Sequence, residues 1–213
     1  MLKAIIFDMD GVITDTVPHH FSAWKKFFKQ EGVNLTRRDY DKKVNGVPRI
    51  DGITNILGKV SKKRLDEMME RKQAFFIEAV NAHPPKTFSG FREFVSKLKR
   101  KKIKIAAASS SKNTEFILKK IKIYDCFDKV ITGYDFKKSK PNPEIFLTAA
   151  KRIKVDPKDC VVFEDAVLGV EAGKKAKMKV VGFASSNIKD VKKADLIIKS
   201  FEKLKVKDIE KLF

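Results

Sequence analysis

The sequence predicts an α/β fold: a parallel β-sheet flanked by helices, with an all-helical segment inserted after the first strand. Three observations support this prediction. Short runs that are apolar at almost every position recur along the chain, as expected for strands buried on both faces. Segments with apolar residues at helical spacing alternate with most of these runs, which indicates a parallel sheet with crossover helices. A long stretch after the first run contains helical patterns only.

The predicted strands are the short apolar runs. The first of them, residues 4–7, comes almost at the start of the chain. The later runs are residues 103–108, 130–131, 161–163, 180–183 and 196–198. Their apolarity is continuous rather than alternating, so we expect helices to cover both faces of the sheet.

The predicted helices of the sheet domain carry apolar residues three and four positions apart. Pro143 stands at an early position of one of them, where proline is tolerated because the first helical N–H groups have no partner within the helix. The four segments are residues 91–98, 116–121, 143–153 and 166–176. They fall between the strands, as crossover connections require.

Residues 16–81 lack any pattern typical of a buried strand. One helix is expected where four aromatic residues share a face: Phe21, Trp24, Phe27 and Phe28. A second helix carries the stripe Leu65, Met68, Met69, Phe75, Phe76 and Ala79. The predicted domains are therefore an α/β core of residues 1–15 and 82–213 and a helical cap of residues 16–81.

The net charge of +20 raises the question of a nucleic-acid partner. The lysines are spread along the chain, singly or in pairs, and no basic patch with interleaved aromatic residues is present. A basic nucleic-acid-binding module therefore remains a remote alternative that only the charge supports. We favour a solvated surface that attracts anionic substrates, and we expect no nucleic-acid partner.

Membrane association is not expected either. No apolar run approaches the roughly 20 residues that a membrane-spanning helix needs. Acidic residues follow the N-terminus too early for a secretory signal peptide. The default expectation is a cytoplasmic monomer.

Polar residues that can do chemistry follow four of the predicted strands. Ligands bind at the carboxyl ends of the strands in open α/β sheets, so these residues are expected to meet at one edge. The four groups, in chain order, are Asp8 with Asp10, the segment 109–113, Lys140, and Glu164 with Asp165.

This combination of residues suits phosphoryl transfer. Asp8 and Asp165 can hold a hard cation such as Mg²⁺, and Lys140 can help to neutralise a phosphate. Ser109 and nearby N–H groups can hold phosphoryl oxygens. One carboxylate can act as nucleophile while another moves protons. Each residue alone is also compatible with a turn or a helix cap.

The segment Asp8-Met9-Asp10-Gly11-Val12-Ile13-Thr14-Asp15-Thr16 resembles the first motif of the haloacid dehalogenase superfamily. Ser109, Lys140 and Glu164-Asp165 match its second, third and fourth motifs. The resemblance implies a Rossmann-like core with a helical cap inserted after the first strand.

The same resemblance implies roles for the motif residues. Asp8 would be the nucleophile and Asp10 the general acid and base. Mg²⁺ would be bound by the side chains of Asp8 and Asp165 and the backbone carbonyl of Asp10, with Glu164 close by. Ser109 and Lys140 would hold the transferring phosphoryl group.

Within the superfamily, the chain is similar to the β-phosphoglucomutase-like subgroup. Residues 19–25 resemble the segment whose histidine helps to couple cap closure to catalysis, and His20 aligns with that histidine. Residues 46–49 resemble a cap loop whose arginine, here Arg49, grips the distal phosphate. The resemblance implies further substrate-binding roles for Lys72, Ser111, Lys112 and Asn113.

Two cap residues have alternative interpretations. Lys72 falls on an apolar helical stripe, so its amine either faces a polar cleft or extends past the stripe into water. His20 shares a face with Trp24 and Phe27 and could be a packing histidine. Arg49 by itself would be interpreted as a surface arginine.

The predicted function is Mg²⁺-dependent phosphoryl transfer on a small phosphorylated sugar through an aspartyl phosphate at Asp8. A phosphomutase would hand the phosphoryl group to a second sugar hydroxyl, and a phosphatase would hand it to water. The two activities use the same residues. Dehalogenation needs neither Mg²⁺ nor an acid and base two residues after the nucleophile, so Asp10 argues against it.

Overall fold

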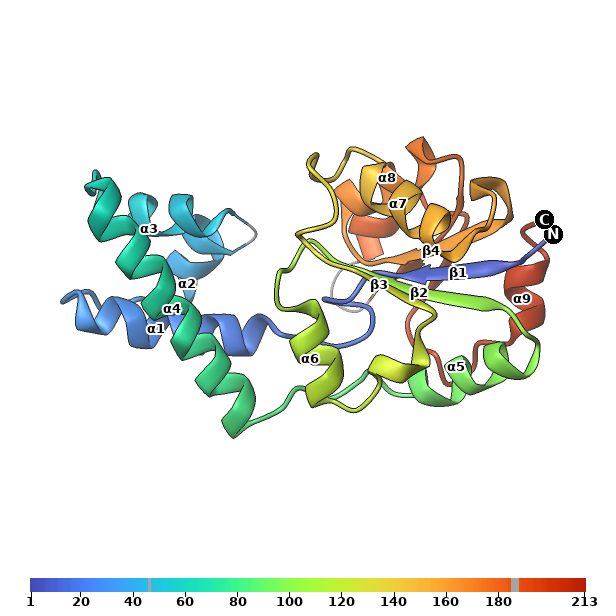
Figure 1. Cartoon of the computed structure of the whole chain (residues 1–213), viewed down its shortest axis with the longest axis horizontal. Helices are drawn as coiled ribbons and strands as arrows, with labels where there is room; N and C mark the ends of the chain where they lie inside the picture. The colour runs from blue at the N-terminus through green and yellow to red at the C-terminus, as the bar shows by residue number, and fades with distance from the viewer. Residues whose placement is uncertain (46, 185–187) are drawn as a thin grey trace. The chain divides into compact units, whose positions relative to one another are not determined.

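The computed structural model describes residues 1–45, 47–184 and 188–213 and divides the chain into two compact units (Figure 1). The core unit comprises Met1–Asp15 and Pro85–Phe213, and the cap unit comprises Thr16–Pro84. The sequence placed the second boundary between residues 81 and 82. The last cap helix continues to Ala82, and the compact cap unit extends to Pro84.

The core unit is built on a six-stranded sheet in which all paired strands are parallel. Its order is β3-β2-β1-β4-β5-β6, the order of a Rossmann-type doubly wound sheet, which confirms the predicted fold class. The strands are β1 (Ala4–Phe7), β2 (Lys104–Ala108), β3 (Lys129–Ile131), β4 (Cys160–Glu164), β5 (Lys179–Phe183) and β6 (Leu196–Ile198).

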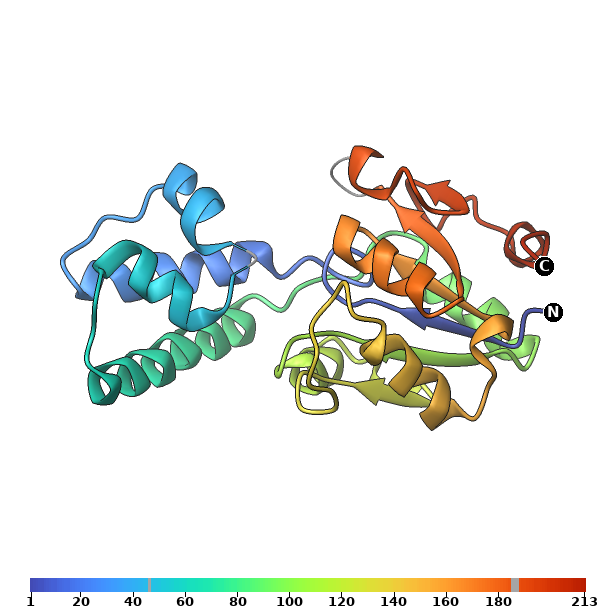
Figure 2. The same cartoon turned by 90° about the horizontal axis from the view of Figure 1, so that it is seen from above.

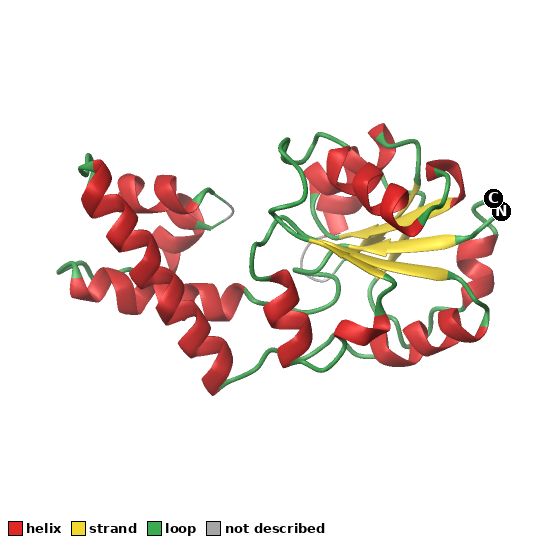
Figure 3. Ribbon diagram, in the orientation of Figure 1, coloured by secondary structure: helices red, strands yellow, loops and turns green. Residues whose placement is uncertain are grey.

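Helices cover both faces of this sheet (Figure 3). On one face, Ala4 and Ile6 of β1 pack into a buried cluster with residues of α7 (Glu144–Ile153) and α8 (Val167–Lys175). On the other face, the ring of Phe7 contacts Phe91 and Phe94 of α5 (Phe91–Arg100). Burial on both faces explains why β1 is apolar at every position.

Shorter elements complete the core unit. They are α6 (Thr114–Lys120), α9 (Val206–Glu210) and the single turns η2 (Tyr124–Cys126), η3 (Pro157–Asp159) and η4 (Ile188–Val191). Across the three described ranges, no helix combines the length and the apolarity needed to cross a bilayer.

The cap unit is all-helical. Its elements are α1 (Val17–Gln30), α2 (Arg37–Asp39), η1 (Tyr40–Val44), α3 (Arg49–Leu57) and α4 (Lys62–Ala82). Helices α1 and α4 lie side by side (Figure 2), and the buried Trp24, Phe27 and Phe28 of α1 join Met68 of α4 in one cluster. Ser61 caps α4 by accepting a hydrogen bond from the Arg64 N–H. The aromatic stripe of the sequence therefore forms the centre of the cap.

Candidate active site

The carboxyl ends of β1 and β4 bring Asp8 and Glu164 to the same level of the sheet. Phe7 is paired with Phe163, and the N–H of Asp8 donates to the Phe163 carbonyl at 3.0 Å. Both carboxylates are buried: Asp8 is 7% exposed and Glu164 is 1% exposed. The strand order reverses between β1 and β4, because the chain passes from β3 at one edge of the sheet back to β4 beside β1. Ligands bind at such a switch point in this architecture.

Lys140 lies between these two carboxylates. Its ammonium forms ion pairs with Oδ1 of Asp8 and Oε1 of Glu164. Burial alone would lower the pKa of Lys140, but the charges of Asp8 and Glu164 outweigh it and raise the pKa above the ordinary value. Lys140 is therefore a fixed positive charge beside the proposed nucleophile.

Backbone groups hold the other oxygen of Glu164. Its Oε2 accepts hydrogen bonds from the N–H groups of Asp165 at 2.8 Å and Ala166 at 2.9 Å. Gly169 in the first turn of α8 leaves room for the carboxylate, since a Cβ at this position would lie 1.8 Å from Oε1. The Glu164 carboxylate is thus occupied by Lys140 and by these N–H groups.

Asp165 stands next to Glu164 in a crowded, negative environment. Burial, followed by the charges of Glu164 and Asp10, raises the pKa of Asp165 to about 7, although Lys140 opposes the shift. The Asp165 carboxylate packs directly against Gly11, where a Cβ would lie 1.8 Å from Oδ2. Gly11 also has a φ of 79°, a conformation that favours glycine.

Asp8 experiences the same excess of negative charge. Burial raises the pKa of Asp8 well above its ordinary value, and Glu164 and Asp165 add to this effect while Lys140 opposes it. A further cation here would favour the charged form of both aspartates.

The donor set fits Mg²⁺, because hard cations prefer carboxylate and carbonyl oxygens. Asp8 and Asp165 are crowded carboxylates whose charged forms are disfavoured, and the Asp165 group fills the space that Gly11 leaves. No three His, Cys, Asp or Glu side chains converge as a complete metal site in the described part of the chain. The resemblance needs only two such side chains and the backbone carbonyl of Asp10.

A tight turn after β1 carries Asp10. The Met9 carbonyl accepts hydrogen bonds from the N–H groups of Ile13 and Thr14, and the Gly11 N–H donates to the Thr14 carbonyl at 2.8 Å. The fully buried Thr14 donates from Oγ1 to the Lys86 carbonyl at 2.7 Å. Asp10 is thereby held in a turn two residues beyond Asp8 rather than in the strand. No pattern in the sequence had indicated that Thr14 anchors this turn to Lys86.

The segment after β2 is fixed by its own serines. Ser109 is buried, and its Oγ accepts a hydrogen bond from the Ser111 N–H at 3.1 Å. The Oγ of Ser111 accepts in turn from the Asn113 N–H, also at 3.1 Å. Lys112 points out of this segment: it is exposed, and its Nζ lies 4.9 Å from the ring centre of Tyr134.

In the cap, Lys72 and His20 form a hydrogen-bonded pair. Lys72 is only 2% exposed, and its Nζ lies 2.9 Å from Nδ1 of His20. The interpretation that Lys72 extends past the stripe into water is therefore wrong. His20 also stacks on Phe76, with ring centres 4.1 Å apart, so it has a packing role and a polar contact at once.

The surroundings of this pair disfavour positive charge. Burial, then the charge of Arg49, lowers the pKa of Lys72 to about 7. Burial, then Lys72 and Arg49, lowers the pKa of His20 well below its ordinary value. An anion bound beside the pair would restore the charged form of Lys72.

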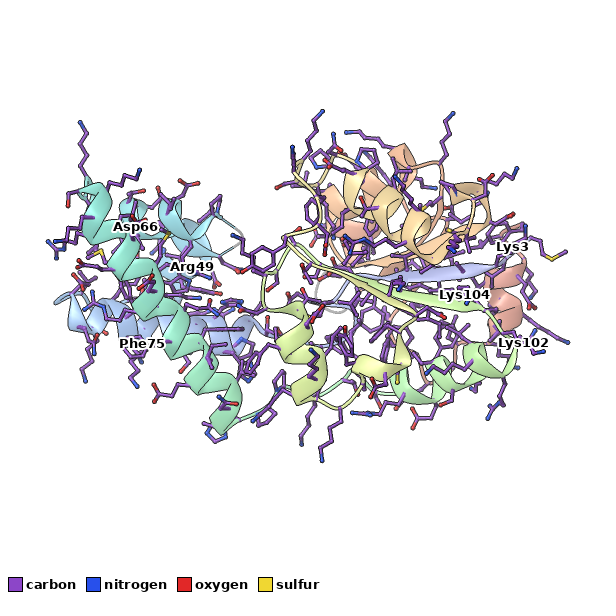
Figure 4. All side chains as sticks on the ribbon, in the orientation of Figure 1. Lys3, Arg49, Asp66, Phe75, Lys102 and Lys104 are labelled. Atoms are coloured by element: carbon purple, nitrogen blue, oxygen red, sulfur yellow. The ribbon has the colours of Figure 1, made fainter. Side chains whose placement is uncertain are left out.

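Arg49 is half-buried against α4 (Figure 4). Its guanidinium donates to the Met69 carbonyl at 3.2 Å and to Oε1 of Gln73 at 2.7 Å. The interpretation as an ordinary surface arginine therefore fails. Gln73 was not among the predicted site residues. Its position, four residues after Met69 and next to Lys72, could have indicated that it belongs with them. Gly46, the first residue of the predicted loop, lies outside the described residues.

Comparison with known proteins decides the family. The sequence model of the haloacid dehalogenase-like hydrolases matches residues 5–183. The chain belongs to this family. The match spans both units, from β1 through the cap to the end of β5, and it confirms the superfamily that the first motif indicated.

Individual relatives place the chain in the β-phosphoglucomutase-like subgroup. It is 36% identical over 205 residues to a β-phosphoglucomutase of Bacillus subtilis, covering 93% of this chain and 89% of the relative. It is 35% identical to a phosphorylated carbohydrates phosphatase of Thermotoga maritima, with 82% of each chain covered.

A solved structure agrees with these relatives. The crystal structure of a β-phosphoglucomutase from Clostridium difficile superposes with a TM-score of 0.86 at 32% identity, covering 99% of this chain and 96% of that one. The chain is therefore an enzyme of the phosphotransferase type.

Proposed function

We propose that this enzyme is a phosphomutase that acts on a small sugar phosphate through an aspartyl phosphate at Asp8. The observation that carries the proposal is the buried arrangement of Asp8, Lys140 and Glu164, in which a permanent cation lies beside the proposed nucleophile. The names of the relatives support the substrate class, since one is a β-phosphoglucomutase and another a phosphorylated carbohydrates phosphatase.

In the first step, an oxygen of Asp8 attacks phosphorus opposite the ester oxygen. The bond from Asp8 to phosphorus forms as the ester bond breaks, and Asp10 gives its proton to the leaving oxygen. In the second step, Asp10 takes the proton of the acceptor hydroxyl, which attacks the aspartyl phosphate and releases Asp8. The turn after β1 supports this division of roles, because its backbone hydrogen bonds hold Asp10 two residues beyond Asp8 and outside the strand.

Three further residues bind the phosphoryl group in this proposal. Lys140 neutralises charge on Asp8 and on the transferring oxygens, and Ser109 donates to one of those oxygens. Glu164 keeps Lys140 in place, as its contacts with both the ammonium and the backbone indicate. Asp8, Asp165 and the carbonyl of Asp10 would hold Mg²⁺, which when bound supplies positive charge that offsets the excess of carboxylates.

The cap residues support a mutase over a simple phosphatase. A mutase must bind a sugar with two phosphate positions, so it needs cations besides those at the transfer site. Arg49 and Lys72, with His20 as the hydrogen-bond partner of Lys72, supply such a group in the cap, and Lys112 supplies a cation in the core. In the core unit, we assign the binding of the non-transferring phosphate to the segment Ser111, Lys112 and Asn113. In the cap unit, we assign a separate substrate-binding role to Arg49 and Lys72.

A product assay tests the proposal. The enzyme is given β-glucose 1-phosphate and Mg²⁺, with and without a catalytic amount of glucose 1,6-bisphosphate, and both possible products are measured. Glucose 6-phosphate formed faster than inorganic phosphate supports a mutase. Inorganic phosphate alone would contradict the mutase and favour the phosphatase that the Thermotoga maritima relative is named for.

Variants show whether Asp8 is responsible. Asp8→Asn keeps the size of the side chain but removes the nucleophilic carboxylate, so both products should disappear. Asp66→Asn is the matched control, because Asp66 is an exposed residue of α4 outside the proposed site. Near-normal turnover by Asp8→Asn would overturn the assignment.

A further inference from the structure

The loop after β3 presents an exposed aromatic residue. Tyr134 is 73% exposed, which is unusual for a large ring. The turn beneath it is well fixed: Oδ2 of Asp135 accepts hydrogen bonds from the Thr132 N–H at 2.7 Å and from its Oγ1 at 3.0 Å. Arg152 pairs with the other oxygen of Asp135 at 2.6 Å. The position of Tyr134 is thus set by neighbours other than its own ring.

This turn lies directly against the segment after β2. The Gly133 N–H donates to the Ser111 carbonyl at 3.2 Å. A Cβ at Gly133 would lie 2.4 Å from the Ser110 carbonyl oxygen, so only glycine permits the close approach. The approach brings the ring of Tyr134 to 4.9 Å from Nζ of Lys112, within the range of a cation–π contact.

We propose that Tyr134 is a positioning residue that holds the Lys112 ammonium ready for a phosphate group of the substrate. This inference rests on the proposed function, in which Lys112 binds the non-transferring phosphate. A free lysine side chain samples many rotamers and loses that freedom when it binds an anion. Contact with a ring on a rigid turn already restricts the rotamers of Lys112, so less conformational freedom is lost when the substrate binds. The ring also leaves the N–H groups of the ammonium available to the phosphate.

Three variants test the inference by steady-state kinetics on the sugar phosphate. Tyr134→Leu removes the ring, and KM should rise about threefold, as expected for loss of an exposed cation–π contact, while kcat stays unchanged. Tyr134→Phe keeps an aromatic face and should retain the KM of the wild-type enzyme. Tyr124→Leu is the matched control. Lys119 lies 4.7 Å from the ring of Tyr124, but Tyr124 comes before β3, at the amino ends of the strands and away from the proposed site.

A merely structural role for Tyr134 would lower kcat or impair the Phe and Leu variants alike. Either result, or an unchanged KM in Tyr134→Leu, overturns the inference. If the unchanged enzyme turns over no sugar phosphate, the proposed function fails, and a binding measurement still decides the role of Tyr134.

That measurement follows the Hε protons of Lys112 by NMR during titration with inorganic phosphate. The ring of Tyr134 should shift these protons upfield in the unchanged protein and in Tyr134→Phe, but not in Tyr134→Leu. Phosphate should bind about threefold more weakly to Tyr134→Leu than to the other two proteins. Equal phosphate affinity in all three proteins, or no ring-current shift, contradicts the inference.

Discussion

Replacing Lys72 by methionine should stabilise the protein at neutral pH and impair its function. Lys72 is 2% exposed, and its amine lies over the rings of Trp24 and Phe76, with His20 as hydrogen-bond partner and Arg49 nearby. Methionine has a similar length and no charge to bury. The perturbation therefore removes an unfavourable charge from a group that the proposed function uses to bind phosphate.

The size of the effect follows from the pKa of Lys72, which falls from 10.5 to about 7 on folding. A pKa that is lower by one corresponds to about 1.4 kcal/mol, so the folded protein bears a cost of about 5 kcal/mol at most when Lys72 must be charged. The variant leaves Nδ1 of His20 without its partner, which costs about 1–3 kcal/mol. The net gain in the free energy of unfolding is about 2–4 kcal/mol at pH 7.

The gain should depend on pH in a defined direction. Between pH 7 and 10.5, the unfolded chain binds a proton at Lys72 that the folded chain lacks, so the stability of the unchanged protein rises with pH. Below pH 7 the cost is complete and constant, and above 10.5 it disappears. The difference between Lys72→Met and the unchanged protein should therefore shrink with rising pH and reverse in sign near the top of this window.

Denaturant unfolding at pH 7, 8, 9 and 10 measures this difference. The single tryptophan, Trp24, lies in the cap beside Lys72, so its fluorescence follows the unfolding of the relevant unit. Lys63→Met is the control, since Lys63 is an exposed residue of the same helix and should change stability by less than about 0.5 kcal/mol at every pH. A pH-independent difference for Lys72→Met would refute the burial of an unfavourable charge.

Three further predictions concern the core unit. Asp10→Ala should lower kcat by about 10²–10⁴-fold and leave Mg²⁺ binding measurable by calorimetry; an unchanged kcat would remove Asp10 from the acid–base role. Lys140→Met leaves Asp8 and Glu164 buried without their cation and should cost about 3–5 kcal/mol in denaturant unfolding, whereas a neutral effect would contradict the ion pairs. Gly169→Ala should lower both the melting temperature and kcat because it displaces Glu164, and a rise in both would show that helix propensity decides instead.

Local patterns in the sequence were enough to predict the sheet and the residues at its edge. The strands are buried on both faces, so their continuous apolar runs stand out, and their carboxyl ends meet in a parallel sheet wherever the helices lie. Asp8, Ser109, Lys140 and Glu164 could therefore be grouped before any contact was known.

The partners of individual side chains could not be predicted in this way. The periodicity of α4 places Lys72 on an apolar face, but the amine finds its partner on α1, 52 positions away in the sequence. The resemblance placed Glu164 close to the metal ligands, but it did not indicate that the oxygens of Glu164 contact Lys140 and two backbone N–H groups. Tyr134 lies in a loop whose significance depends entirely on a segment that follows another strand.

The reasons for two glycines near the site could not be predicted from the sequence either. Gly11 and Gly169 are unremarkable in the sequence, but each occupies a point where a carboxylate oxygen passes 1.8 Å from a would-be Cβ. Gly11 is approached by Asp165 from a distant part of the chain, and Gly169 by Glu164 across the turn from β4 into α8. Both approaches depend on how the elements pack, so the sequence pattern alone does not indicate them. Motif resemblance included Gly11 in its segment without explaining why a glycine is needed there.

The most direct test of the central claim is to trap the aspartyl phosphate. The enzyme is mixed with substrate and Mg²⁺, denatured within the first turnover, reduced with borohydride and digested for mass spectrometry. An aspartyl phosphate is reduced to homoserine, so the predicted result is homoserine at position 8 and unchanged aspartate at position 10. Turnover without any modification at Asp8, or modification at Asp10 or Asp165 instead, would contradict the account.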